Sequence, residues 1–398
     1  MNVNFTFIIF ETHINFQILH SDGNFKDFKV QVEIESPGRI NLIGEHTDYN
    51  QGFVMPTAID KKIYFKLGKN NSASLCRIYS ETYNSSFQLN LQKITKSKNP
   101  WENYILGVVN EIQQLGKQLS GFDCVLKSEL PIGAGISSSA ALECGLASGL
   151  NELFELKLSK IDIIKLAQRA EHNFVGSNCG IMDQYASVMS RKDHLILLDC
   201  ESLDAEYIPA DFRNCKILLL NTRVSHSLAD SKYNSRRQEC EEGVRIIAKT
   251  HPEVKSLRDI DEQMLENSKD KLPGKIYERC SYVIEENKRV QKAAEAIKNG
   301  NVTEFGNLMY ASHDELQHKY EVSCAELDFL VDFSRDKEFI YGARMMGGGF
   351  GGCTINLIET DKIDKFIEEA DKAYFGKFGI NPEPIIVEAD AGTIITRN

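Results

Sequence analysis

A serine-rich turn between a strand-like and a helix-like segment is the strongest chemical feature of the sequence. Residues 131–143 read Pro-Ile-Gly-Ala-Gly-Ile-Ser-Ser-Ser-Ala-Ala-Leu-Glu. Gly133 and Gly135 allow a sharp turn, and the serines from Ser137 onward place hydroxyls where a helix begins. The first amides of a helix lack intrahelical acceptors and carry partial positive charge, so the turn is predicted to bind phosphate. A serine N-cap after an ordinary glycine turn is the alternative.

This turn has no lysine of its own, because no GxxxxGK[ST] sequence occurs in the chain. The negative charge of a bound triphosphate therefore has to be met from elsewhere. Mg²⁺, or an arginine or lysine distant in sequence, is expected to supply that positive charge.

A second polar segment, residues 36–52, follows a strand-like stretch. Pro37 and Gly38 are expected to form a turn, and Arg39 offers a permanent cation. The tetrapeptide Glu45-His46-Thr47-Asp48 groups four polar side chains, a composition that suits a ligand with many hydroxyls. A solvated polar loop is the alternative. A metal site is less favoured, since the chain has no HExxH sequence.

Glycine also dominates a third segment, where five of the chain's 27 glycines fall within residues 347–352. The spacing formally matches GxGxxG, but the segment leads into a strand-like stretch instead of a helix, which argues against a dinucleotide fingerprint. A loop that closes over a phosphate or nucleotide is the functional interpretation, and a flexible hairpin tip is the alternative.

Two single residues elsewhere in the chain are also candidates. Asp183 is a candidate base or a helix cap, and Tyr233 is a ligand contact or an amphipathic anchor.

Hydrophobic periodicity predicts the elements that must position these segments. Alternation predicts strands near residues 30–34 and 122–130, and further strands at residues 353–358 and 384–387. Helical spacing predicts helices over residues 142–153, 163–174 and 363–374, the last with Asp361 as a cap. The strand–helix–strand order near the C-terminus indicates a small α+β sandwich. We place the boundary between two halves near residue 215, where an acidic stretch becomes apolar.

Composition excludes several classes of protein. The chain has 398 residues, of which 42% are hydrophobic and 26% charged, so it can fill two or three domains. It contains no apolar run of the roughly 18 residues that a membrane span needs. A formal net charge of −11 disfavours nucleic-acid binding. Ten cysteines without a CxxC pair indicate thiols in a reducing compartment, and the opening stretch has no signal-peptide pattern, so we expect a cytoplasmic protein.

In this order, the motifs resemble the galactokinases of the GHMP small-molecule kinase family. Residues 38–50 resemble the galactokinase signature, and residues 131–143 and 347–354 resemble two glycine-rich motifs of the wider family. Residues 179–184 match a further segment. The resemblance implies an α+β fold with a ribosomal-protein-S5-domain-2-like N-terminal domain, residues 1–215, and a ferredoxin-like C-terminal domain, residues 216–398. Whether the last strand returns to the first domain is left open.

The implied reaction transfers the γ-phosphoryl group of ATP to the anomeric hydroxyl of α-D-galactose, the first committed step of galactose use by the Leloir pathway. By resemblance, Asp183 is the proton acceptor and Arg39 lies beside it, where its charge should keep Asp183 ionised. The resemblance implies a sugar pocket lined by Glu45, His46, Thr47, Asp48, Gly180 and Tyr233. It implies ATP contacts from Ser80, Gly133, Ala134, Gly135, Ile136, Ser137, Ser138 and Ser139. Ser139 and Glu171 are implied to hold Mg²⁺.

Galactose and ATP are thus the expected small-molecule partners of a monomer. A kinase for N-acetylgalactosamine or another sugar remains an alternative, because the room beside the C2 substituent cannot be read from the sequence. A sugar sensor without turnover is a second alternative. The intact run Ser137–Ala141 favours an enzyme, because a non-catalytic sensor of the same family lacks a Ser-Ala pair there. The first 28 or so residues match no family motif and receive no function.

Overall fold

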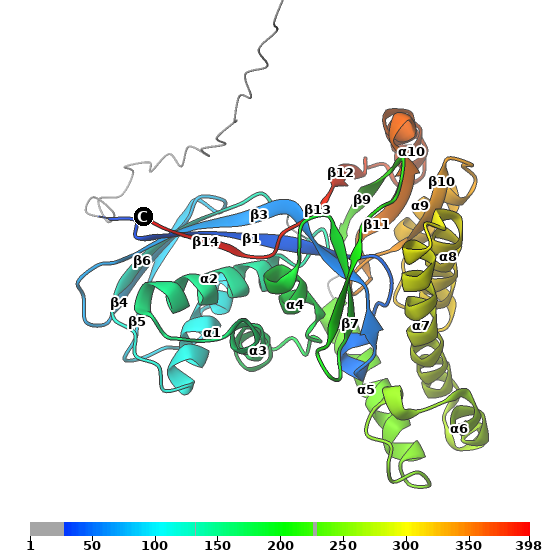
Figure 1. Cartoon of the computed structure of the whole chain (residues 1–398), viewed down its shortest axis with the longest axis horizontal. Helices are drawn as coiled ribbons and strands as arrows, with labels where there is room; N and C mark the ends of the chain where they lie inside the picture. The colour runs from blue at the N-terminus through cyan, green and yellow to red at the C-terminus, as the bar shows by residue number, and fades with distance from the viewer. Residues whose placement is uncertain (1–27, 132, 226–228) are drawn as a thin grey trace, which may run out of the picture.

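The first of two main sheets packs one face against helices (Figure 1). The computed structural model describes residues 28–131, 133–225 and 229–398. Strand order is β14-β1-β3-β6-β4-β5, with β13 also paired to β3 and with β4 and β6 parallel. The strands are β1 (Val32–Asn41), β3 (Pro56–Lys69), β4 (Leu75–Ser80), β5 (Ser85–Asn90), β6 (Phe122–Ser128), β13 (Ala389–Asp390) and β14 (Ile394–Arg397). The helices on this side are α1 (Pro100–Gln114), α2 (Ser138–Phe154), α3 (Lys160–Ala170), η3 (Glu171–Val175) and α4 (Met182–Met189).

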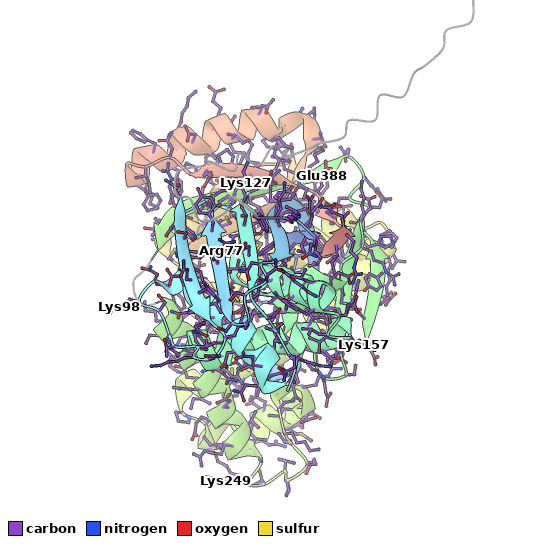
Figure 2. The ribbon with its side chains drawn as sticks, turned by 90° about the vertical axis from the view of Figure 1, so that its left-hand side faces the viewer. Arg77, Lys98, Lys127, Lys157, Lys249 and Glu388 are labelled. Carbon is purple, nitrogen blue, oxygen red and sulfur yellow. The ribbon has the colours of Figure 1, made fainter. Side chains whose placement is uncertain are left out.

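Alternation along β1 explains how this sheet buries one face. Val32 and Ile34 are buried, whereas Glu33 and Glu35 are partly exposed. Helix α2 approaches the sheet closely at Gly149, where a Cβ would collide with Ile34. The opposite face carries charged side chains, including Arg77 and Lys127 at the end of the molecule away from the second sheet (Figure 2).

The second sheet has the order β10-β11-β9-β12 and is antiparallel throughout. Its strands are β9 (Cys215–Ser225), β10 (Ile340–Met345), β11 (Gly351–Glu359) and β12 (Glu383–Val387). The helices around it are α7 (Gly274–Lys298), α8 (Val302–His318), α9 (Ala325–Arg335), η6 (Thr360–Lys362) and α10 (Ile363–Phe378), while α5 (Ala229–Ile247), η4 (Leu257–Asp259), α6 (Glu262–Asn267) and η5 (Lys269–Lys271) lie at one end. A small sheet joins β2 (Phe53–Val54), β7 (His194–Asp199) and β8 (Ala205–Pro209), and η2 (Asp48–Asn50) precedes β2.

Both sheets share one apolar core, which holds them in a fixed relation. Ile34 of β1, Val290 of α7 and Ile355 of β11 belong to the same buried cluster. After β12 the chain crosses back, and β14 pairs with β1 so that Ile395 lies opposite Ile34. Among the described residues, no helix is both long and apolar enough to cross a membrane.

The strands expected near residues 122–130, 353–358 and 384–387 are confirmed, as are the helices over 142–153, 163–174 and 363–374. The turn expected at Pro37 and Gly38 is wrong, because both residues lie inside β1 at a register shift. A Cβ on Gly38 would meet the carbonyl oxygen of Ile136, so this glycine permits close approach and makes no turn. The expected Asp361 cap is also wrong. Asp361 lies in η6, where it forms an ion pair with Lys362.

Candidate active site

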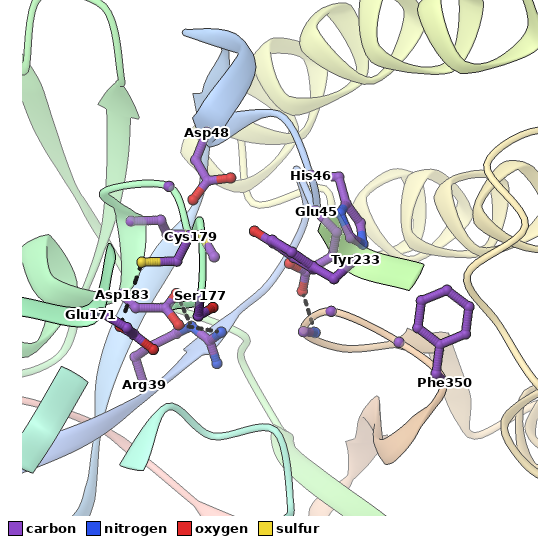
Figure 3. Close-up of a pocket in the computed structure, with 15 residues that line it drawn as sticks. Arg39, Glu45, His46, Asp48, Glu171, Ser177, Cys179, Asp183, Tyr233 and Phe350 are labelled. Carbon is purple, nitrogen blue, oxygen red and sulfur yellow. Dashed lines mark hydrogen bonds and ion pairs between the residues drawn. The ribbon is translucent and has the colours of Figure 1, made fainter. Parts of the chain in front are cut away.

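Two adjoining cavities lie between the sheets and share one wall. The smaller, of about 220 Å³, is lined by residues of the 45–48 segment, by Gly180 and by Tyr233. The larger, of about 470 Å³, is lined by the serine-rich turn and the glycine-rich loop of residues 347–352. Both are lined by Arg39, Glu171, Ser177, Asp183, Gly348, Gly349 and Phe350. Segments more than 100 residues apart therefore meet at Asp183 (Figure 3).

Asp183 is held at this junction by two groups. The Arg39 guanidinium donates from Nε to Oδ1 at 2.9 Å and from Nη2 to Oδ2 at 3.0 Å. The Ser137 hydroxyl donates to Oδ2 as well. Although burial alone would lower the pKa of Arg39, the carboxylates of Asp183 and Glu45 raise it overall, so Arg39 remains a cation. The Asp183 side chain is still 24% exposed, so the carboxylate is fixed in direction and accessible to a ligand.

The serine-rich turn lines the larger cavity where α2 begins. Ser137 adopts a left-handed conformation (φ 57°) directly before α2, and no side-chain cap bond forms there. Ser137 thus stands at the N-cap position that the alternative interpretation expected, but its hydroxyl donates to Asp183 instead of capping the helix. The third guanidinium donor, Nη1 of Arg39, reaches the carbonyl oxygen of Gly135 at 2.7 Å. The first amides of α2 thus remain available to an anion.

The glycine-rich loop covers the same cavity from the second sheet. Gly347, Gly349 and Gly352 all have φ near 80°, a region that other residues rarely adopt. A Cβ on Gly347 would lie 3.3 Å from the carbonyl oxygen of Gly135, so the loop approaches the serine-rich turn closely. Phe350 takes φ 58° despite its side chain and lines both cavities. The loop and the turn together form a backbone-lined site for a charged group.

Acidic and aromatic groups line the smaller cavity. Burial, and next the charge of Asp183, raises the pKa of Asp48 to about 7, so its carboxyl group is partly protonated at neutral pH. Gly180 lies directly against this carboxylate, where any Cβ would overlap it. The Tyr233 ring lies 5.3 Å from the His46 ring, centroid to centroid. The cavity therefore offers hydrogen-bond donors, acceptors and an aromatic wall to a polar ligand.

A chain of hydrogen bonds orients His46. Its Nδ1 lies 2.8 Å from the Tyr49 hydroxyl, which lies 2.8 Å from the Tyr320 hydroxyl. Burial, and next the positive charge of Arg236, lowers the pKa of His46 to about 3, so the imidazole is neutral at physiological pH. Its Nε2 is buried and has no hydrogen-bond partner among the described residues. A ligand hydroxyl in the cavity would satisfy that nitrogen.

Glu45 is fixed by a residue of the second sheet. Its Oε1 accepts from Arg344 Nη2 at 3.0 Å and from the backbone amide of Gly347 at 2.8 Å. Arg344 was not among the site residues predicted from the sequence. A single arginine in the otherwise apolar strand β10, directly before the glycine-rich loop, was the available signal.

A group of carboxylates adjoins the serine-rich turn. Glu171 accepts hydrogen bonds from the side chains of Cys179 and Gln184, and it lines the larger cavity together with Ser139. Burial, and next the charge of Asp183, raises the pKa of Glu171 to about 7. Both carboxyl oxygens of the buried Glu143 lack a hydrogen-bond partner among the described residues, and burial, and next the charge of Glu171, raises its pKa well above the usual value. No group of three His, Cys, Asp or Glu residues that could hold a metal ion occurs in the described part of the chain.

The structure brings most of the expected site residues together, but two of them line neither cavity. Thr47 is buried, and its hydroxyl donates to the carbonyl oxygens of Gly44 and Phe53 at 2.8 and 2.6 Å, so it shapes the loop instead of facing a sugar. Ser80 is buried at the end of β4, where its hydroxyl accepts from the amide of Tyr83. Lining residues that the sequence interpretation missed include Ser177, Met182, Phe350, Tyr104 and Val224.

Three family profiles match the chain. They are described as galactokinase galactose-binding signature (residues 25–69), GHMP kinases N terminal domain (residues 103–191) and GHMP kinases C terminal (residues 293–376). The galactokinase of Thermosipho africanus is 43% identical over 352 residues, which are 88% of this chain and 96% of the relative. That of Fusobacterium nucleatum is 40% identical over 366 residues, which are 90% of this chain and 94% of the relative.

Solved structures extend this similarity to the fold. The crystal structure of Lactococcus lactis galactokinase complexed with galactose matches with a TM-score of 0.88 at 32% identity, covering 92% of this chain and 95% of that one. Methanococcus jannaschii mevalonate kinase matches with a TM-score of 0.63 at 22% identity, covering 91% of this chain and 99% of that one. The second likeness concerns the fold alone.

Proposed function

The chain belongs to the galactokinases of the GHMP kinase family, and from this premise we propose that the two adjoining cavities are its active site. The enzyme phosphorylates the anomeric hydroxyl of α-D-galactose with ATP, giving α-D-galactose 1-phosphate and ADP, the first committed step of the Leloir pathway. Galactose occupies the smaller cavity, and the ATP phosphates occupy the larger one. The observation that carries this assignment is the position of Asp183 and Arg39 on the wall that both cavities share.

Asp183 acts as the proton acceptor. Its carboxylate is aimed by the two paired donors of Arg39 and by the Ser137 hydroxyl, and it remains accessible from both cavities. A sugar hydroxyl that donates to Asp183 would have its oxygen directed toward the phosphate side, which aligns the nucleophile with the γ-phosphorus. Arg39 adds positive charge beside the equatorial oxygens that gain charge in the transition state.

The phosphate groups are bound by backbone. Residues 137–139 at the start of α2 line the larger cavity, and Gly133 and Gly135, which also line it, add no side chains there. The residues proposed to contact ATP are Gly133, Ala134, Gly135, Ile136, Ser137, Ser138 and Ser139. Positive backbone ends bind a triphosphate even though the chain as a whole is acidic, because the interaction is local.

Ser139 and Glu171 would hold Mg²⁺. Both supply oxygen ligands, which Mg²⁺ prefers, and both line the phosphate cavity. Two protein ligands fit a site completed by phosphate oxygens and water. The raised pKa of Glu171 and the unpartnered oxygens of Glu143 both indicate that this acidic corner favours a cation. Bound Mg²⁺ supplies charge neutralisation for the β- and γ-phosphates.

The sugar is bound by Glu45, His46, Asp48, Gly180 and Tyr233. Glu45 accepts from a sugar hydroxyl, and the unpartnered Nε2 of the neutral His46 pairs with another. Asp48, with a pKa near 7, can donate or accept. Gly180 has to lack a side chain because Asp48 occupies the adjoining space.

We also propose a division near residue 215, with residues 389–397 returning to the first domain. The pairings of β13 with β3 and of β14 with β1 support that return. A cytoplasmic location is supported by the ten cysteines, all of which are free thiols. Size-exclusion chromatography with light scattering tests whether the protein is a monomer.

A product assay tests the proposed function. Incubation with galactose and Mg·ATP should yield hexose 1-phosphate and ADP by mass spectrometry, in equal amounts. Asp183→Ala should retain galactose binding by calorimetry and lose sugar-dependent ADP release. Unchanged release would remove Asp183 from the role of base. Faster turnover of N-acetylgalactosamine than of galactose would transfer the assignment to a kinase for that sugar.

A further inference from the structure

Arg344 is a buried arginine whose hydrogen bonds mostly cross from the second sheet into the first domain. It lies on β10, yet its Nε donates to the carbonyl oxygen of Leu42 at 2.8 Å and its Nη2 to that of Asn41 at 2.5 Å. Nη2 also donates to Glu45 Oε1 at 3.0 Å, and only Nη1 bonds to its own strand, at the Met345 carbonyl oxygen. The side chain has no exposed surface, so this cation is fully committed to these partners.

The same carboxylate oxygen of Glu45, a residue of the smaller cavity, binds the first residue of the loop whose later residues line the larger cavity. Oε1 accepts from Arg344 and also from the backbone amide of Gly347, the first residue of the glycine-rich loop. That loop approaches the serine-rich turn, where a Cβ on Gly347 would lie 3.3 Å from the Gly135 oxygen and one on Gly352 would lie 3.6 Å from Ala134. One side chain of the sugar cavity thus anchors the loop that covers the phosphate cavity.

Such an anchor matters because glycine restrains the backbone little. Four of the loop's glycines have positive φ. Glycine loses more conformational entropy than other residues when its backbone is fixed, so ordering this loop costs free energy. Two further backbone bonds fix its ends, from Met346 N to the Cys353 oxygen and from Phe350 N to the Val322 oxygen, at 3.0 and 2.8 Å. The bond from the Gly347 amide to Glu45 is the one of these three that ends on a side chain facing the sugar cavity.

We propose that Arg344 is a positioning residue that couples galactose binding to ATP binding through Glu45 and the Gly347 amide. The inference rests on the proposed function, because it takes the smaller cavity as the sugar site and the larger as the phosphate site. A galactose hydroxyl on Glu45 adds a further bond to a carboxylate whose Oε1 already accepts from Arg344 and from the Gly347 amide, and so strengthens the hold of that carboxylate on the loop. The loop is then ordered before the nucleotide binds. The free energy of ATP binding is no longer reduced by the entropy of ordering the loop, so galactose raises the affinity for ATP.

Calorimetry on the complete chain tests the coupling. The dissociation constant of galactose is measured with and without a non-hydrolysable ATP analogue and Mg²⁺, and that of the analogue with and without galactose. We expect each ligand to bind at least about fivefold tighter in the presence of the other, by equal factors because the linkage is reciprocal. Arg344→Lys keeps the positive charge but loses the planar guanidinium and its several donors. In this variant the ratio of dissociation constants without and with the other ligand should fall toward one. Arg344→Lys with the wild-type factor overturns the proposal.

A matched control separates coupling from general loss of stability. Arg279 is similarly buried and donates to Glu239 and Glu321 at 2.9 and 2.6 Å, but it lines neither cavity. Arg279→Lys should keep the wild-type coupling factor. Loss of coupling in Arg279→Lys as well would show that the effect is a general one and overturn the specific role of Arg344.

Hydrogen exchange on the wild-type chain keeps the proposal testable if Arg344→Lys does not fold. Galactose alone should slow exchange in the peptide that contains residues 347–352, in addition to the peptide that contains Glu45. Protection of the Glu45 peptide without protection of residues 347–352 overturns the coupling and leaves the sugar site intact. Absence of galactose binding overturns the proposed function itself, and the coupling falls with it.

Discussion

Arg39→Lys tests whether the planar fork of Arg39, beyond its charge, aligns the proton acceptor. Arg39 makes three hydrogen bonds, two to Asp183 and one to the Gly135 oxygen. A lysine ammonium keeps the charge, but it cannot hold both carboxylate oxygens and the carbonyl oxygen in one geometry. We expect kcat to fall far more than galactose affinity, because the lost bonds aim Asp183 and do not contact the sugar.

The size of the effect follows from the number of bonds lost. Hydrogen bonds to charged groups contribute about 1.5–3 kcal/mol each. Loss of one such bond to Asp183, together with a weaker one to the Gly135 oxygen, should raise the barrier by about 3 kcal/mol. At about 1.4 kcal/mol per tenfold, kcat should fall roughly a hundredfold. The dissociation constant of galactose should change less than about threefold.

Steady-state kinetics and calorimetry measure these two quantities, and Arg77→Lys is the matched control. Arg77 makes the same paired contact with Asp123, from Nε at 2.7 Å and from Nη2, but on the outer face of the first sheet (Figure 2). It should lower stability by roughly 1 kcal/mol and leave kcat unchanged. A normal kcat in Arg39→Lys, or an equal loss in Arg77→Lys, would refute the alignment role of Arg39.

Three other substitutions probe the sugar cavity. Gly180→Ala should raise the galactose dissociation constant at least about tenfold, because the new methyl group would overlap the Asp48 carboxylate. The control Gly376→Ala, at a position with open space around it, should leave that constant unchanged. Calorimetry measures both constants. Tyr49→Phe removes the hydroxyl that contacts His46 Nδ1, so KM for galactose should rise about fivefold with little change in kcat; an unchanged KM would argue against the hydrogen-bond chain. Burial, and next a neighbouring aspartate, raises the pKa of Asp48 from 3.8 to about 7, so the folded chain retains a proton that the unfolded chain has released between these values. Stability without ligand should therefore fall as pH rises through this window, and Asp48→Asn should flatten that part of the Tm profile; an identical slope would contradict the raised pKa.

Local chemistry in the sequence predicted the phosphate turn and the main elements. Alternation at Val32 and Ile34 and the helical spacing from Leu142 onward describe single strands and helices, whose apolar faces are set by neighbours close in sequence. The serine-rich turn was recognisable because strand, glycines and helix start are contiguous. The turn predicted at Pro37 and Gly38 was wrong, because the pairing of β1 with β3 overrides the turn propensity of these two residues. The sugar contact predicted for Thr47 also depends on tertiary structure. Its hydroxyl donates to carbonyl oxygens of Gly44 and Phe53, and the sequence pattern does not reveal these bonds.

By itself, then, the sequence determined which residue types were available for binding phosphate and sugar, and it identified the family through their order. Tertiary structure decided which of them meet. Arg39 reaches Asp183 across 144 positions of chain, and Arg344 reaches Glu45 across 299. Periodicity cannot report such pairs, because direction and distance between remote segments arise only when the two sheets pack around a common core.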